Sequence, residues 1–287
     1  MVAPAFDYVA AGSYDEAVRL LAAGGDEAKL LAGGQSLMPM LNLRLARPEL
    51  LIDINQADQR PPSVADGLLR LPALTRHRVL GEHDLVRREC PLLADAIRHV
   101  GNVRVRNRGT IGGSLAHADP TSEIGCCALV TGARVVVRGP AGDRTLGVSE
   151  LFDTYWTTTL AADEVITDVL IPVARPRQGW SFQEMVRRTS DFAIVAVAAL
   201  VELDERADAI TAARVALAGV ADRVTLADLT GLVGANEDFD AAAAAIAGRL
   251  EPATDVHASG EYRRRLARVL VARALRQACA RASGAAA

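Results

Sequence analysis

Apolar positions near the N-terminus follow helical and strand periods in turn. Ser13 and Glu16 form a capping-box pattern ahead of an apolar stripe, which predicts a helix that ends at the glycine pair 24–25. The apolar run at residues 28–31 predicts a short buried strand, residues 37–45 a helix that ends before a proline, and residues 50–54 a further strand. We therefore expect a mixed segment of strands and helices here.

The middle of the chain continues this mixture. Alternation over residues 68–81 predicts a small antiparallel hairpin, and residues 84–100 follow a helical period. Residues 124–129 also read as helical, whereas residues 134–137 and 164–171 read as strands of one sheet, with a turn at "GPAGD" after the first of them.

The C-terminal part changes character after a stretch that contains two prolines and a glycine. We place a domain boundary there, between residues 1–175 and residues 176–287, and divide the first domain into subdomains of about 1–56 and 57–175. The segments "SFQEMVRR" and "DFAIVAVAALVEL" read as strands, and residues 214–220 follow them. The chain then finishes in alanine-rich helices, the last of which is expected to bury one face. That face consists of Leu266, Val269, Leu270, Ala274 and Leu275.

Composition narrows the class of protein. The chain has 287 residues, a formal net charge of −3 and 50% hydrophobic residues, which argues against a nucleic-acid partner. The start has no basic patch followed by an apolar run, and no apolar stretch reaches the roughly 20 residues of a membrane helix, so we expect a cytoplasmic protein. The four cysteines show no CxxC pairing and are expected to be free thiols that hold no metal. They are Cys90, Cys126, Cys127 and Cys279.

Two glycine-rich loops carry the candidate chemistry. The first, "AGGQS" at residues 32–36, lies where a predicted strand meets a predicted helix, and the second is "GTIGGS" at residues 109–114. Glycine allows positive φ and removes Cβ, so successive amides can converge on an anion, and two such loops could share one diphosphate. Neither loop matches the GxGxxG or GxxxxGK[ST] pattern, and each alone could equally be a tight turn.

Several polar residues near the second loop have simpler interpretations. Arg104, Arg106 and Arg108 alternate along a segment that we read as one exposed extended edge. Asp119 precedes a proline and is expected to cap a helix, which leaves Glu123 as the better functional candidate. His117 has no metal-ligand spacing and no neighbouring nucleophile, so we assign it no catalytic role.

Four stretches together closely resemble the FAD-binding medium subunit of the molybdenum hydroxylases, the carbon monoxide dehydrogenase and xanthine dehydrogenase family. They are "LLAGGQSLMPMLNLRLARPELLIDI", "RNRGTIGGSLAHADPTSE", "RRTSDFAIVAVAA" and "EYRRRLARVLVARAL". The resemblance covers essentially the whole chain. It implies an α+β fold: an FAD-binding domain of the vanillyl-alcohol oxidase and p-cresol methylhydroxylase (PCMH/VAO) type with two α+β subdomains, then a C-terminal domain with a three-stranded antiparallel sheet and a helical bundle.

The resemblance also implies a non-covalent FAD site. It places two segments around the FAD diphosphate. These are Leu31, Ala32, Gly33, Gly34, Gln35, Ser36, Leu37 and Met38 in the first, and Thr110, Ile111, Gly112, Gly113 and Ser114 in the second.

Four more residues are implied around the rest of the cofactor. Glu123 would approach the ribityl or ribose hydroxyls, Ile166 would lie near the flavin ring, and Gln183 and Phe192 would face the ring from the C-terminal domain. Some relatives carry a lysine near the position of Gln183, where this chain has none, so the resemblance does not fix the redox tuning of the flavin here.

The function implied is electron transfer within a larger oxidoreductase. A large partner would hold the molybdenum cofactor and a small partner the [2Fe–2S] clusters, assembled as a dimer of heterotrimers, and FAD on this chain would pass electrons to an external acceptor. Two other functions stay open at this point. One is a stand-alone FAD-dependent oxidase or reductase, and the other is a nucleotide-binding module without redox activity.

Overall fold

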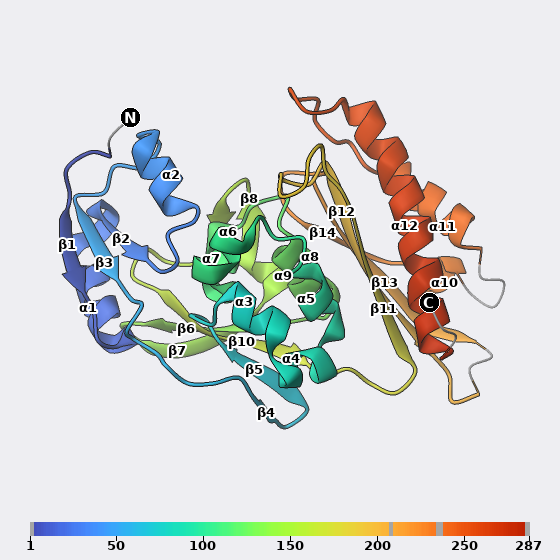
Figure 1. Cartoon of the computed structure of the whole chain (residues 1–287), viewed down its shortest axis with the longest axis horizontal. Helices are drawn as coiled ribbons and strands as arrows, with labels where there is room; N and C mark the ends of the chain where they lie inside the picture. The colour runs from blue at the N-terminus through green and yellow to red at the C-terminus, as the bar shows by residue number, and fades with distance from the viewer. Residues whose placement is uncertain (1–2, 207–208, 234–237, 285–287) are drawn as a thin grey trace.

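The computed structural model describes residues 3–206, 209–233 and 238–284. The described chain is α+β. In Figure 1, three main sheets follow one another from the N-terminal to the C-terminal part of the molecule.

The first sheet is parallel and has the strand order β1-β3-β2. It consists of β1 (Asp7–Ala10), β2 (Ala28–Leu31) and β3 (Leu50–Asp53). Helix α1 (Tyr14–Gly24), followed by a 3₁₀ turn η1 (Gly25–Glu27), buries its apolar stripe against this sheet. Helix α2 (Leu37–Asn42) begins after the first glycine loop.

The second sheet is antiparallel, with the strand order β4-β5-β10-β6-β7. Its strands are β4 (Ser63–Ala65), β5 (Leu68–Pro72), β6 (Arg134–Gly139), β7 (Gly142–Gly147) and β10 (Val165–Pro172). Besides β6 and β7, the chain between β5 and β10 forms the following elements: α3 (His77–Glu82), α4 (Asp84–Glu89), α5 (Pro91–Ala96), α6 (Val103–Arg108), α7 (Ile111–His117), α8 (Glu123–Val130), α9 (Val148–Leu151), β8 (Phe152–Thr154) and β9 (Thr157–Thr158).

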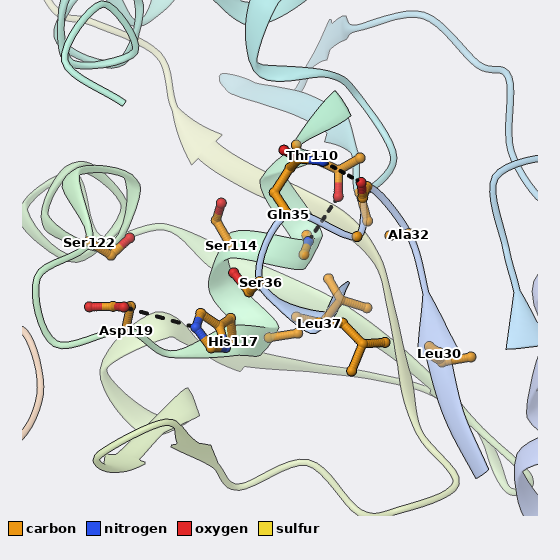
Figure 2. A pocket seen from close by; sticks show the side chains of 18 of the residues that line it. Leu30, Ala32, Gln35, Ser36, Leu37, Thr110, Ser114, His117, Asp119 and Ser122 are labelled. Carbon is orange, nitrogen blue, oxygen red and sulfur yellow. Dashed lines mark hydrogen bonds and ion pairs between the residues drawn. The ribbon is translucent and has the colours of Figure 1, made fainter. Parts of the chain in front are cut away.

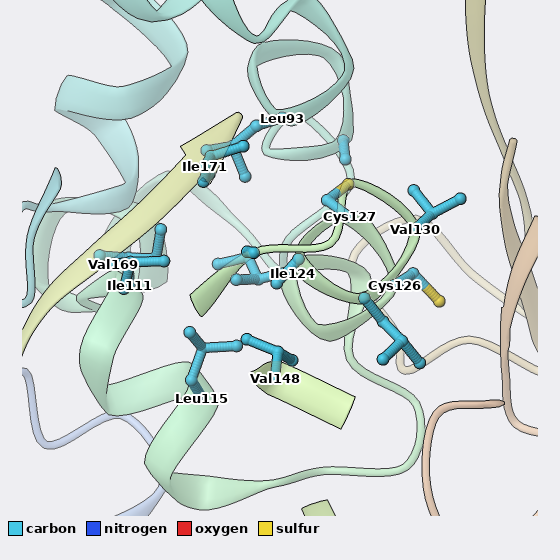
Figure 3. Close-up of a cluster of buried hydrophobic side chains, with 14 of the residues drawn as sticks. Leu93, Ile111, Leu115, Ile124, Cys126, Cys127, Val130, Val148, Val169 and Ile171 are labelled. Atoms are coloured by element: carbon cyan, nitrogen blue, oxygen red, sulfur yellow. The ribbon is translucent and has the colours of Figure 1, made fainter. Parts of the chain in front are cut away.

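Helices α7 and α8 pack against a core of buried hydrophobic side chains. Ile111 and Leu115 of α7 and Ile124 of α8 are almost fully buried against Val169 and Ile171 of β10 (Figure 3). Because large buried aliphatic side chains resist displacement, this core gives the second glycine loop a rigid base.

The third sheet is antiparallel, with the order β11-β12-β13-β14. Its elements are β11 (Gln178–Met185), β12 (Val195–Leu203), β13 (Ile210–Ala218) and β14 (Thr225–Asp228), followed by α10 (Thr230–Val233), α11 (Phe239–Ala247) and α12 (Gly260–Ala282). The long helix α12 covers one face and α8 the other (Figure 1). Strand β12 is therefore buried on both faces, which explains the apolar run of its first seven residues, 195–201. The three long strands match the expected sheet, and β14 adds a short fourth strand.

Several predicted elements are confirmed. Strand β2 has the expected bounds, and Ser13 caps α1, with its Oγ accepting a hydrogen bond from the Glu16 amide at 3.2 Å. The Glu16 carboxylate accepts a hydrogen bond from the amide of Gly12 at 2.7 Å, whereas in a standard capping box the donor is the amide of the next residue, the N-cap. The strands predicted at 134–137 and 164–171 belong to one sheet.

The hairpin predicted over residues 68–81 is wrong in its second half. Strand β5 forms its hairpin with the preceding strand β4, through a turn at Asp66 and Gly67, both of which have positive φ. Residues 77–82, which were expected to form the second strand, form helix α3. An Asp-Gly pair is a strong two-residue hairpin signal, so the sequence did carry this turn.

Three helical expectations also need correction. The helix predicted at 84–100 is divided into α4 and α5, because Pro91 cannot continue α4 and instead starts α5. Helix α2 ends at Asn42 rather than at residue 45. On α12, Val269 is 53% exposed, although the other four residues of the predicted face are buried.

The arginine trio is helical rather than extended. The Asn102 side chain accepts hydrogen bonds from the amides of Arg104 and Val105 at 2.9 and 3.3 Å, which starts α6. The Arg106 guanidinium then donates to the carbonyl of Gly101 at 2.9 Å. The interpretation of this segment as a strand edge was therefore wrong.

Candidate functional site

A cavity of about 660 Å³ lies where the three main sheets' loops converge. In Figure 2, Leu30 and Leu37 lie to one side, His117, Asp119 and Ser122 to the other, and Ser36 and Ser114 between them. The volume is within the range of roughly 300–1,000 Å³ that is typical of small-molecule and cofactor sites.

The first glycine loop contributes unused main-chain donors to this cavity. Gly34 takes a φ of +72°, and the Gln35 side chain folds back so that its Nε2 donates to the Gly33 carbonyl at 3.0 Å. Among the described residues, no protein group accepts a hydrogen bond from the amides of residues 33–37. Since amides without partners favour an anionic oxygen, this loop fits a phosphate group.

The second glycine loop is built differently. The amides of Ile111 and Gly112 donate to the carbonyls of Thr75 and Ala73 at 3.2 and 2.8 Å, and the amide of Gly113 donates to Thr110 Oγ1 at 3.2 Å. The interpretation of this loop as a second set of free amides is therefore wrong. It contributes a surface without side chains at Gly113 and a hydroxyl group at Ser114.

The two loops touch through their backbones. A Cβ atom added at Gly33 would lie 2.2 Å from the Arg108 carbonyl oxygen and 2.9 Å from Gly109 Cα. Glycine is required at position 33 because the second loop packs directly on it, rather than because a ligand fills the space.

A hydrogen-bonded clamp holds this contact together. The Arg76 guanidinium donates to the Arg108 carbonyl and, at 2.6 Å, to Asn55 Oδ1. Asn55 Nδ2 in turn donates to the Ala32 carbonyl at 2.9 Å. We call Arg76 and Asn55 the loop clamp, because together they join the first glycine loop to the Arg108 carbonyl, which immediately precedes the second loop. Neither residue had been identified from the sequence.

The far side of the cavity begins with a turn rather than a helix. Asp119 Oδ1 accepts hydrogen bonds from the amide and hydroxyl of Thr121 at 2.8 and 2.6 Å. Ser122 caps α8, with its Oγ accepting from the Gly125 amide at 3.0 Å. The prediction that Asp119 starts the helix is wrong, and Asp119 lines the cavity instead. His117 also lines it, 3.9 Å from the Asp119 carboxylate.

Glu123 is the first residue of α8 and lines the cavity. Burial raises the pKa of its carboxyl group to about 7, and the nearby carboxylates of Glu184 and Asp119 act in the same direction. Glu184 itself is paired with His99, whose Nδ1 lies 3.2 Å from Glu184 Oε2. Glu123 can therefore be a neutral hydrogen-bond donor as well as an acceptor near neutral pH.

This raised pKa predicts a pH-dependent stability. A pKa of about 7, against the ordinary 4.5, means that the folded protein keeps this proton longer than the unfolded chain, so stability is lost as the pH rises through 7. The Glu123→Gln variant should match the ligand-free wild type near pH 4.5 and exceed it at pH 8.5 by up to about 3 kcal/mol. Urea unfolding of both proteins at each pH measures this. A difference that does not change with pH would contradict the burial of this carboxyl group.

The structure brings most of the candidate residues together. Thirteen of them line the cavity: Ala32, Gly33, Gly34, Gln35, Ser36, Leu37, Thr110, Gly112, Gly113, Ser114, Glu123, Ile166 and Phe192. Four do not: Leu31, Met38, Ile111 and Gln183. The Gln183 amide instead bonds to Ser181 Oγ and Gln277 Oε1 at 3.2 and 2.9 Å, and Ile111 is part of the core. Phe192 is 77% exposed.

The cavity also has lining residues that were not identified beforehand. His77 and Lys29 belong to this group, together with Ser190 and Asp191, which precede Phe192. Lys29 is the single lysine of the chain. No group of side chains that could hold a metal ion occurs among the described residues.

Comparison with known proteins places this geometry in a family. The FAD-binding domain of molybdopterin dehydrogenase matches residues 4–174, and the CO dehydrogenase flavoprotein C-terminal domain matches residues 180–278. The chain is 38% identical to the 6-hydroxypseudooxynicotine dehydrogenase complex subunit alpha of Paenarthrobacter nicotinovorans, over 98% of this chain and 97% of that protein. It is 35% identical to the carbon monoxide dehydrogenase medium chain of Hydrogenophaga pseudoflava, over 98% and 99%.

Solved structures agree with these sequence relatives. The carbon monoxide dehydrogenase from Hydrogenophaga pseudoflava that lacks the Mo-pyranopterin moiety of its cofactor superimposes with a TM-score of 0.94 at 35% identity, over 98% of this chain and 99% of that one. Quinoline 2-oxidoreductase from Pseudomonas putida 86 gives a TM-score of 0.91 at 33% identity, over 98% and 99%.

The fold and the cavity thus define an FAD-binding oxidoreductase subunit. The chain belongs to the family of FAD-binding medium subunits of molybdenum hydroxylases. In the part of the chain that the structure describes, no helix has both the length and the apolar character needed to cross a membrane.

Proposed function

We propose that this chain is the FAD-carrying electron-transfer subunit of a molybdenum-containing hydroxylase or dehydrogenase. A large partner would carry the molybdenum cofactor and a small partner the [2Fe–2S] clusters, in a dimer of heterotrimers within the cytoplasm. Relatives named as a medium chain and as a subunit of a dehydrogenase complex support this assembly. The proposed domain boundary at residues 175 and 176 falls between the two matched family segments.

The observation that carries the proposal is the set of free amides at residues 33–37, all of which belong to residues that line the cavity. These donors fit a diphosphate, and the loop clamp keeps them against the second loop. We propose that the thirteen lining residues contact FAD, while Leu31, Met38, Ile111 and Gln183 support the site from behind.

The two sides of the cavity suit the two ends of such a cofactor. Leu30 and Leu37 offer an apolar surface to a base, whereas Glu123 can bond to hydroxyl groups. FAD, when bound, supplies the one- and two-electron chemistry, and the chain supplies binding, orientation and local charge. Ile166 and Phe192 are proposed to lie near the flavin ring.

A visible spectrum of the purified chain tests the cofactor assignment. We expect oxidised-flavin bands that bleach with dithionite. A colourless protein that cannot be reconstituted with FAD would instead favour a nucleotide-binding module without redox activity.

Isolation of the tagged chain from its native cell tests the assembly. We expect one larger and one smaller partner, with molybdenum and iron detected by elemental analysis. Recovery of a flavin-containing homodimer alone would favour a stand-alone oxidase or reductase.

A further inference from the structure

His77 lies directly beneath the second glycine loop. It is the first residue of α3, it is buried, and its amide donates to the Gly109 carbonyl at 3.0 Å. A Cβ atom added at Gly109 would lie 2.7 Å from the imidazole Cε1. The ring is therefore packed against the loop backbone and has little freedom to rotate.

The imidazole has one polar contact that reaches the cavity. Its Nε2 lies 3.0 Å from the Oγ of Ser114, and Ser114 lines the cavity (Figure 2). The other nitrogen, Nδ1, is buried and has no hydrogen-bond partner among the described residues.

The ring is neutral at physiological pH. Burial lowers the pKa of His77 to about 4, against the opposing effect of a backbone hydrogen bond with Thr110, and the positive charges of Arg76 on α3 and Arg106 on α6 lower the pKa further. A neutral imidazole carries a single proton, on one nitrogen or the other.

The surroundings decide which nitrogen carries that proton. A proton on Nδ1 would leave a buried N–H group without an acceptor, and such orphaned donors are rare in folded proteins. If the proton is on Nε2, that N–H group donates to Ser114 Oγ, and Nδ1 is left as an acceptor whose lone pair has no donor. The Nε2–H form is therefore favoured. In that form Ser114 accepts from the ring, and its own hydroxyl hydrogen is free to point into the cavity.

We propose that His77 is a positioning residue of the cofactor site: its Nε2–H donates to Ser114 Oγ, which leaves the Ser114 hydroxyl as a donor to an anionic oxygen of the bound ligand. That ligand is the diphosphate of FAD, so this identification rests on the proposed function. The amides of residues 111–114 in the second loop already donate to protein groups. The donor that this loop offers to the ligand is therefore the Ser114 hydroxyl group.

Nitrogen NMR of the ligand-free chain tests the tautomer directly. In protein labelled with ¹⁵N-histidine, His77 is identified as the signal missing from the His77→Gln variant. We expect a protonated Nε2 and an unprotonated Nδ1 at pH 7. A protonated Nδ1 would overturn the proposal, because Ser114 would then donate to the ring. This measurement needs no FAD, so it stands even if the chain proves not to bind a flavin.

FAD affinity tests the consequence. Loss of a charge-assisted hydrogen bond in Ser114→Ala should weaken FAD binding roughly 10- to 100-fold. His77→Leu, which removes the donor, should weaken binding similarly, and His77→Gln, which keeps an N–H donor of similar reach, should recover most of the affinity.

The double variant separates positioning from simple destabilisation. If His77 acts through Ser114, then His77→Leu should have little further effect on the FAD dissociation constant in the Ser114→Ala background. Full additivity of the two effects would overturn the proposal. Absence of FAD binding by the wild type would contradict the proposed function instead, and the NMR result would still decide the role of His77.

Discussion

The Gly33→Val variant is expected to fold and to purify without FAD. Any Cβ at this position meets the Arg108 carbonyl oxygen at 2.2 Å, and valine adds two methyl groups to it. The obstacle is backbone, so a side-chain rotation cannot relieve it, and the two loops must separate. Separation moves the free amides of the first loop away from the ligand, and we expect FAD affinity to fall at least about 100-fold, or about 3 kcal/mol.

Gly231→Val is the matched control. Gly231 is exposed at the start of α10, and an added Cβ there meets no atom within 4 Å. This variant should retain FAD in the same ratio to protein as the wild type, measured by absorbance. Normal flavin content in Gly33→Val would show that the contact between the loops is not needed for binding.

The second large effect is expected from the loop clamp. Arg76→Ala removes the donors to the Arg108 carbonyl and to Asn55 Oδ1, and it leaves Asn55 to hold only the first loop. Hydrogen bonds from charged groups contribute about 1.5–3 kcal/mol each, so we expect a loss of about 2–4 kcal/mol in the free energy of unfolding and a fall in FAD affinity of about tenfold or more. Chemical denaturation and FAD titration measure the two effects.

Arg78→Ala provides the comparison on the same helix. Arg78 pairs with Glu82 at 3.2 Å, with both side chains about 60% exposed, and a solvent-exposed pair of this kind contributes at most about 0.5 kcal/mol. Equal losses of stability for the Arg76 and Arg78 variants would show that the clamp has no special role.

Local signals were enough to predict many elements of the fold. Strand β12 and the cap of α1 follow from residues adjacent in sequence, whose burial or hydrogen bonding is fixed within a few positions. Two of the errors also had local signals that were overlooked. The pair Asp66–Gly67 marks the β4–β5 turn, and Asn102 caps α6.

The functional site was predictable only in part. The glycine loops are visible as motifs, but the sequence does not show which amides stay free. Among the described residues the amides of 33–37 do, whereas those of 111–114 bond within the protein. The loop clamp joins Arg76 to Asn55, 21 positions away, and His77 meets Ser114 across 37 positions. Such contacts arise from tertiary packing, for which a sequence pattern of period 2 or 3.6 carries no information.

The central claim is that main-chain amides of the first loop, held against the second loop, bind the diphosphate of the cofactor. Calorimetric titration of the ligand-free chain with FAD and with riboflavin, which lacks phosphate, tests it most directly. We expect FAD to bind at least about 100-fold more tightly than riboflavin and ADP to compete with FAD. Equal affinity for riboflavin and FAD, with no competition by ADP, would contradict it.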